Sequence, residues 1–183
     1  MPKIILLLLI FCLSGCKNER VEQRSEKDRL VNDYIQKYRI MAKTEQLNSG
    51  IPASIKLAQG ILESKSGTSE LAIKANNHFG MKCGRLWKGV KYTSNSDEWD
   101  RNKRRMIARK SCFKSFASVE LCYSAHSQLL KQKRYKKLFE LDRRDYKNWA
   151  LGIQKLGYAS DPDYAKKIII IIERYHLDEL DKD

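Results

Sequence analysis

Hydrophobic side chains recur every three or four residues in several stretches of the chain, which is the period of an amphipathic α-helix. Within residues 51–67, Leu57 and Ile61 have the i,i+4 spacing of neighbours on one helix face. Pro52 suits the first turn of this helix, and Gly67 suits its end. The same period predicts further helices over residues 30–41, 69–75, 118–130, 146–153 and 162–175, with Ser69 and Ser118 as N-caps.

Residues 84–111 do not show this helical spacing of hydrophobic side chains. Residues 90–93 and 106–108 favour two short strands, and the polar residues 95–105 between them are typical of a turn. The sequence therefore predicts an α+β fold, mainly helical, with a small β-hairpin lobe. A length of 183 residues, 42% of them hydrophobic, leaves room for one ordinary domain with a single core.

The N-terminus has the pattern of an export signal. Lys3 precedes the apolar residues 4–13, a run too short to span a bilayer. It ends in Leu-Ser-Gly-Cys, which resembles a bacterial lipobox with Cys16 as the lipidated residue. The alternative is an ordinary cleaved signal with an incidental cysteine.

These features predict a signal peptide over residues 1–15, a lipidated, flexible tether over residues 16–29 and a folded domain over residues 30–183. The charged and polar composition of residues 17–28 is the reason to expect flexibility. We expect an exported lipoprotein that is anchored to a membrane through Cys16 and faces the periplasm or cell wall.

The 36 basic and 22 acidic residues give a net charge of +14. This charge favours anionic surroundings, namely nucleic acid, an acidic membrane surface or a cell-wall polymer. No nucleic-acid-binding motif accompanies it, so we expect no nucleic-acid partner. The basic runs at residues 101–110 and 131–137 are either solvated faces or surfaces that attract anionic glycan peptides or lipid headgroups.

After export, three cysteines would remain in an oxidising compartment. Cys83 and Cys112 flank the predicted hairpin, which favours a disulfide between them, and Cys122 is then a buried thiol. The cysteines show no paired CxxC spacing, and we predict neither a metal site nor a cofactor.

Glu63 is the first candidate for chemistry. It closes the apolar helix over residues 51–67, where loss of solvent raises a carboxyl pKa and keeps a proton available near neutral pH. A general acid needs that property. The alternative is a solvated glutamate in the last turn, beside Lys65.

Three motifs lie along the chain in a fixed order. They are Ala-Gln-Gly-Ile-Leu-Glu-Ser at residues 58–64, Asn-Asn-His-Phe-Gly-Met-Lys at residues 76–82 and Gly-Tyr-Ala-Ser-Asp-Pro-Asp-Tyr-Ala at residues 157–165. Together they resemble glycoside hydrolase family 73, the peptidoglycan-cleaving N-acetylglucosaminidases that also occur in flagellar rod-associated muralytic proteins. The resemblance runs from Tyr34 to the C-terminus and implies a lysozyme-like fold.

The resemblance also implies roles for individual residues. Glu98, with Asp97 as the next choice, matches an acidic residue on the family's flexible β-lobe and would be the second carboxylate of a glycosidase. These acids could instead solvate a turn. Tyr158 would face the cleft and orient the acetamido group or a water near Glu63, unless it is a core tyrosine.

Substrate-binding positions follow from the same motifs. Gln59 and Asn77 would supply polar contacts, and Phe79 would be a packing aromatic of the cleft or part of the core. Ser160 replaces the threonine usual in the family and keeps a hydroxyl that can cap the next helix. The histidines His78 and His126 lack partners at ligand or triad spacing and are predicted to be structural.

The sequence thus predicts a monomeric peptidoglycan hydrolase, an endo-β-N-acetylglucosaminidase with Glu63 as general acid. Inversion, retention and substrate assistance all stay open. Two other functions remain, a lytic transglycosylase and a non-catalytic cell-wall-binding lipoprotein.

Overall fold

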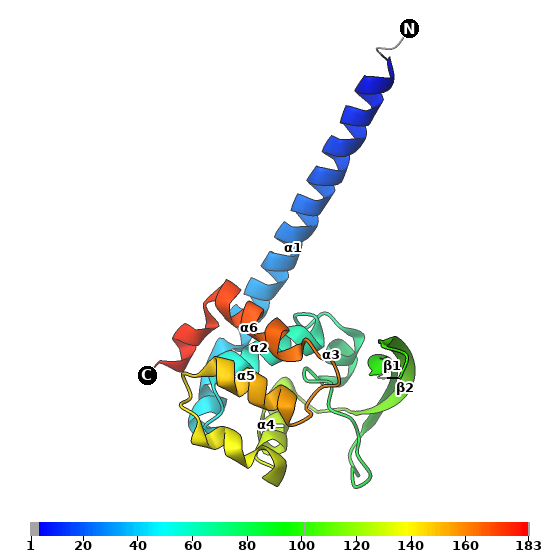
Figure 1. Ribbon diagram of the computed structural model, residues 1–183. Helices are drawn as coiled ribbons and strands as arrows, with labels where there is room; N and C mark the ends of the chain where they lie inside the picture. The colour runs from blue at the N-terminus through cyan, green and yellow to red at the C-terminus, as the bar shows by residue number, and fades with distance from the viewer. Residues whose placement is uncertain (1–3, 101, 183) are drawn as a thin grey trace.

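The computed structural model describes residues 4–100 and 102–182, with side chains for residues 21–95, 100, 102–105 and 107–182. Helices make up most of the body (Figure 1). The α-helices are α1 (Ile4–Ser49), α2 (Ala53–Ser64), α3 (Glu70–Ala75), α4 (Val119–Leu130), α5 (Tyr146–Lys155) and α6 (Tyr164–Tyr175), and the 3-10 helices are η1 (Lys133–Glu140) and η2 (Leu177–Asp181). With the one two-stranded sheet found in the described residues, this confirms the α+β, mainly helical prediction.

Helix α2 lies at the centre of the body and packs against α1, α5, α6 and η2 (Figure 1). The helix is buried on nearly all sides. The i,i+4 apolar pairs in the sequence predicted burial of two of these sides. Gly60 permits the close approach of α1, because a Cβ atom there would lie 2.4 Å from the Tyr34 hydroxyl. The site residues at the end of α2 are therefore held by the core of the protein.

Helix α1 is longer than predicted and projects from the body as a rod (Figure 1). It runs through residues 17–28, where the sequence indicated an irregular tether. Glutamate, glutamine, lysine and arginine are good helix formers, which explains this difference. Arg174 and Tyr175 of α6 donate hydrogen bonds to the Asp28 carboxylate and attach the helix to the body. The division into signal peptide, tether and domain stays a prediction.

The strands β1 (Lys91–Asp100) and β2 (Arg105–Lys114) pair antiparallel, from Lys91 opposite Lys114 to Asp100 opposite Arg105. The prediction of a polar turn over residues 95–105 was therefore wrong for most of that segment. Backbone hydrogen bonds between the two strands extend the hairpin, and these bonds do not need apolar side chains. The predicted disulfide between Cys83 and Cys112 is confirmed.

Several local predictions can be checked directly. Ser69 and Ser118 cap α3 and α4 as expected, and Cys122 is a free, buried thiol. The cap predicted for Ser160 is absent, because α6 begins later, with Asp163 at its N-cap position and Ser160 exposed to solvent. Among the residues that the structure describes, no helix is both long and apolar enough to cross a bilayer.

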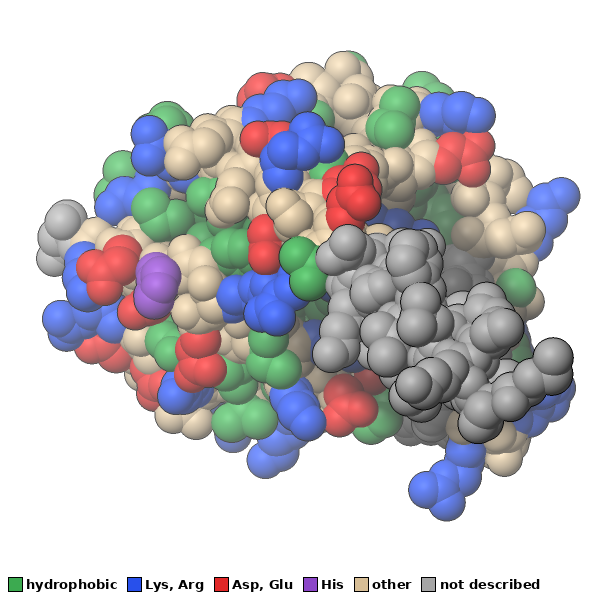
Figure 2. All heavy atoms as spheres, turned by 90° about the horizontal axis from the view of Figure 1, so that it is seen from above, with side chains coloured by type: hydrophobic (Ala, Val, Ile, Leu, Met, Phe, Trp, Pro, Cys, Tyr) green, Lys and Arg blue, Asp and Glu red, His purple; other side chains and the backbone are tan. Residues whose placement is uncertain are grey.

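The charged side chains are mixed on the face seen in Figure 2. Lysine and arginine side chains lie there singly or in small groups, with acidic side chains between them. On that face the basic side chains therefore form small groups and not one continuous patch.

Candidate active site

Glu63 occupies the last turn of α2, where its side chain is half-buried. The phenol of Tyr164, the first residue of α6, donates a 2.9 Å hydrogen bond to Glu63 Oε1. Burial raises the pKa of Glu63 to about 7; the hydrogen bond from Tyr164 opposes this shift, and the charge of Asp161 adds to it. The carboxyl therefore keeps its proton up to neutral pH, as predicted for this position.

Tyr164 is a site residue that the sequence analysis assigned to an apolar stripe. It is buried, and its hydroxyl accepts a 3.0 Å hydrogen bond from Gln59 Nε2. The hydroxyl's one proton points to Glu63 Oε1, so the proton of a neutral Glu63 resides on Oε2. The backbone of the 76–82 motif approaches that oxygen, since a Cβ atom at Gly80 would lie 3.5 Å from Glu63 Oε2.

Tyr158 lies beside this pair. Its ring centroid is 5.6 Å from that of Tyr164, and the charge of Glu63 contributes, after burial, to a pKa of Tyr158 well above 10. The Tyr158 residue is half-buried, and its hydroxyl makes a 3.1 Å hydrogen bond with His126 Nε2 and a long one, 3.4 Å, to the carbonyl oxygen of Phe79. The third motif therefore supplies two phenols next to Glu63.

The predicted substrate contacts Gln59, Asn77 and Phe79 are all buried. Gln59 is engaged with Tyr164. The Asn77 amide donates to the carbonyl oxygens of Met81 and Lys114, and its oxygen accepts from backbone N–H groups. These side chains hold the motif loops in place and do not face solvent, and their contact with a substrate stays a prediction.

Phe79, His78 of the second motif and His126 of α4 are also buried. Phe79 stacks on His126 at a centroid distance of 3.9 Å. His78 Nδ1 lies 3.1 Å from the Tyr34 hydroxyl, within hydrogen-bond distance. Both histidines thus have structural partners, and the indication of a packing role for Phe79 is confirmed.

The hairpin acids Asp97 and Glu98 lie outside the described side chains. Their backbones belong to β1, opposite Ala108 and Ile107 of β2. Asp100, the next acid of β1, accepts hydrogen bonds from two backbone N–H groups of the turn that follows it. That carboxylate is therefore engaged in the hairpin itself, and the role of Asp97 and Glu98 stays a prediction.

The described residues include no group of three or more histidine, cysteine, aspartate or glutamate side chains that could hold a metal ion. The chemistry that this arrangement supports is proton transfer. A neutral carboxyl group has one oxygen fixed by Tyr164, while its other oxygen lies next to the loop at Gly80.

Comparison with known proteins places this site in a family. The family model of the glucosaminidases, described as mannosyl-glycoprotein endo-beta-N-acetylglucosaminidase, matches residues 40–177. The exo-glucosaminidase LytG of Bacillus subtilis is 43% identical over 135 residues, which cover 70% of this chain and 46% of LytG. The peptidoglycan hydrolase FlgJ of Vibrio parahaemolyticus is 28% identical over 68% of this chain and 41% of FlgJ. The chain thus spans less than half the length of these two relatives.

Solved structures show the same fold. An N-acetylmuramoyl-L-alanine amidase from Staphylococcus aureus superposes with a TM-score of 0.75 and 29% identity, over 84% of this chain and 44% of that one. The C-terminally truncated glycoside hydrolase domain of FlgJ from Salmonella typhimurium superposes with a TM-score of 0.63 and 26% identity, over 80% and 97% of the two chains. These neighbours confirm the lysozyme-like fold, and the chain belongs to the glucosaminidase family, as its three motifs indicated.

Proposed function

We propose that this protein is a peptidoglycan hydrolase that cleaves the glycan strand after N-acetylglucosamine, with Glu63 as its general acid. The observation that carries the proposal is the half-buried Glu63 carboxyl, whose pKa is raised to about 7 and whose Oε1 is fixed by Tyr164. Retaining and inverting glycosidases both need a protonated carboxyl to donate a proton to the leaving oxygen. Glu63 Oε2 carries that proton at neutral pH and below.

The second carboxylate comes from β1. Glu98, with Asp97 beside it, is the candidate on the hairpin, the counterpart of the family's β-lobe. Its task is to activate water or to attack the sugar, since a glycosidase needs a base or nucleophile as well as an acid. Tyr158 orients the acetamido group or the water next to Glu63.

The names of the relatives support the substrate class. LytG is called an exo-glucosaminidase and FlgJ a peptidoglycan hydrolase, whereas the family model is described by an endo activity. We propose endo cleavage for this chain. A time course distinguishes the two modes, since endo cleavage releases long fragments first and exo cleavage releases small ones throughout.

The enzyme acts outside the cytoplasm under this proposal. The disulfide between Cys83 and Cys112 fits an oxidising compartment. The relatives of the protein are hydrolases of the cell wall. We propose that Cys16 carries the lipid that anchors a monomeric enzyme to the membrane.

The test is a digest of purified sacculi, followed by borohydride reduction and mass spectrometry of the soluble fragments. Fragments that end in reduced N-acetylglucosamine support the proposal. Anhydro-muramyl ends would instead identify a lytic transglycosylase. Binding of the folded protein to sacculi without release of fragments would leave a non-catalytic wall-binding protein.

A further inference from the structure

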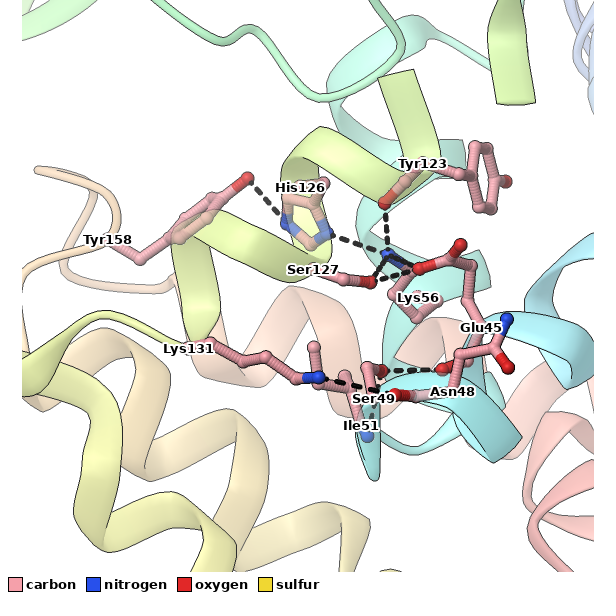
Figure 3. A network of polar contacts seen from close by, with 10 residues as sticks. All are labelled: Glu45, Asn48, Ser49, Ile51, Lys56, Tyr123, His126, Ser127, Lys131 and Tyr158. Atoms are coloured by element: carbon pink, nitrogen blue, oxygen red, sulfur yellow. Dashed lines mark hydrogen bonds and ion pairs between the residues drawn. The ribbon is translucent and has the colours of Figure 1, made fainter. Parts of the chain in front are cut away.

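Lys56 of α2 is fully buried, with 0% of its side chain exposed. Figure 3 shows its polar partners. A buried amine is costly unless its charge is paired and each of its N–H groups is bonded. Lys56 Nζ donates hydrogen bonds of 2.7 Å to the carbonyl oxygen of Tyr123 and 2.7 Å to Ser127 Oγ, and His126 Nδ1 lies 3.4 Å away. Three acceptors match the three protons of an ammonium group.

The counter-ion is Glu45 of α1. Its Oε2 lies 3.8 Å from Lys56 Nζ and accepts a short hydrogen bond from the Ser127 hydroxyl. Because that hydroxyl gives its one proton to Glu45, it can only accept from Lys56. The donors and acceptors are therefore fixed from Lys56 through Ser127 to Glu45.

The same reasoning fixes the tautomer of His126. An ammonium group has no lone pair, so His126 Nδ1 must be the acceptor and the ring proton resides on Nε2. Nε2 then donates to the Tyr158 hydroxyl, 3.1 Å away (Figure 3). The phenol's own proton is left for the 3.4 Å contact with the carbonyl oxygen of Phe79 or for a substrate bound as proposed above.

We propose that Lys56 is a positioning residue that acts through His126 and turns the Tyr158 hydroxyl into a proton donor beside Glu63. This inference rests on the proposed function, because it assigns a task to Tyr158 in that site. With Lys56 neutral, its lone pair can accept a hydrogen bond from Nδ1–H of the other His126 tautomer, and the unprotonated Nε2 then accepts a hydrogen bond from the Tyr158 hydroxyl. Tyr158 would then offer a substrate only a lone pair.

The surroundings of Lys56 allow both forms near neutral pH. Burial lowers the pKa of Lys56 to about 7, against the opposing charge of Glu45 on α1 and the influence of Cys122 on α4. The other groups that face the amine are His126, the Tyr123 ring at 5.3 Å and the Phe79 ring at 5.4 Å. Burial and the Lys56 charge hold the pKa of His126 well below 6.5, so its ring is neutral and has a definite tautomer.

The first test is nitrogen NMR of histidine-labelled protein at pH 6, with the His126 signals assigned by their loss in His126→Gln. The proposal predicts that the proton resides on Nε2 of His126 in the wild type. It also predicts that the Nε2–H fraction falls in Lys56→Met. Tyr34→Phe is the matched control, because it deletes buried hydrogen bonds to Tyr123 and His78 without touching His126. A wild-type ring with its proton on Nδ1 overturns the proposal.

The second test is kinetic, with soluble glycan strands as substrate. Lys56→Met is expected to lower kcat about tenfold with KM little changed, a smaller loss than that of a group that transfers the proton itself. In a Tyr158→Phe background the same substitution should cause no further loss. Full additivity of the two effects would contradict action through Tyr158. Because the NMR readout needs no activity, it separates failure of this inference from failure of the proposed function.

Discussion

The phenol of Tyr164 donates a 2.9 Å hydrogen bond to Glu63 Oε1 and so joins the start of α6 to the end of α2 across 101 residues of sequence. Gln59, one turn before Glu63, donates to the same phenol and fixes which way its proton points. The bond leaves Glu63 Oε2 as the oxygen that carries the proton of the neutral carboxyl group. The predictions below follow from this arrangement.

Activity should fall with rising pH above neutrality. A general acid acts only while protonated, and burial raises the pKa of Glu63 to about 7. Below that pH the acid form predominates, and above it the rate should fall about tenfold per pH unit. A profile of kcat/KM between pH 4 and 9 checks this, and undiminished activity at pH 9 would contradict the assigned role.

Tyr164→Phe should move the fall of kcat/KM at alkaline pH, the alkaline limb of the profile, to higher pH. The Tyr164 hydrogen bond favours the ionised carboxylate and lowers the pKa of Glu63, so its removal lets burial raise the pKa further. Tyr146→Phe is a matched control, because its half-buried hydroxyl bonds Glu173 away from the site. A limb that moves to lower pH in Tyr164→Phe would show that the sign of this effect is wrong.

Glu63→Gln should stabilise the fold at alkaline pH. The folded pKa of about 7 lies above the ordinary value of 4.5, so the wild type loses stability as pH rises through this window. Glutamine resembles the protonated form. The variant should equal the wild type below pH 4.5 and exceed its unfolding free energy by on the order of 1–3 kcal/mol at pH 8. Urea unfolding at both pH values measures the difference, and equal stability at pH 8 would argue against a raised pKa.

The disulfide should stabilise the hairpin lobe. It closes a loop of 29 residues between Cys83 and Cys112. Loop entropy assigns such a bond about 3 kcal/mol of unfolding free energy. The Cys83→Ser/Cys112→Ser variant should unfold at lower urea concentration, and a reducing agent should destabilise the wild type but not this variant. Equal unfolding curves for the wild type and the variant would show that the bond contributes little.

The raised pKa of Glu63 and the disulfide could be predicted from the sequence for physical reasons that are local. Glu63 lies at the end of an apolar helix, and Cys83 and Cys112 flank the hairpin that the sequence predicts, so neighbouring residues alone indicated their setting. In the structure Cys112 lies within β2. The length of the hairpin was underestimated, because ladder hydrogen bonds between distant segments do not register in a side-chain pattern.

The polar partners of the site were harder to predict. Tyr164 has the spacing of a core residue on α6, and its hydroxyl meets Glu63 only once two helices pack. A signal did exist, since Tyr164 belongs to the third motif. Lys56 and Gln59 were visible as polar residues on a helix that is buried almost throughout. Such residues need buried partners, but the pattern does not say which distant residue supplies them.

The most direct test of the central claim is the release of soluble fragments from purified sacculi at pH 6 by Glu63→Gln, with folding checked by circular dichroism. Glu70→Gln, which alters an exposed acid of α3, is the control. The loss of a general acid should reduce the rate by at least about 100-fold, while the control digests as the wild type does. Digestion at the wild-type rate by folded Glu63→Gln would contradict the account.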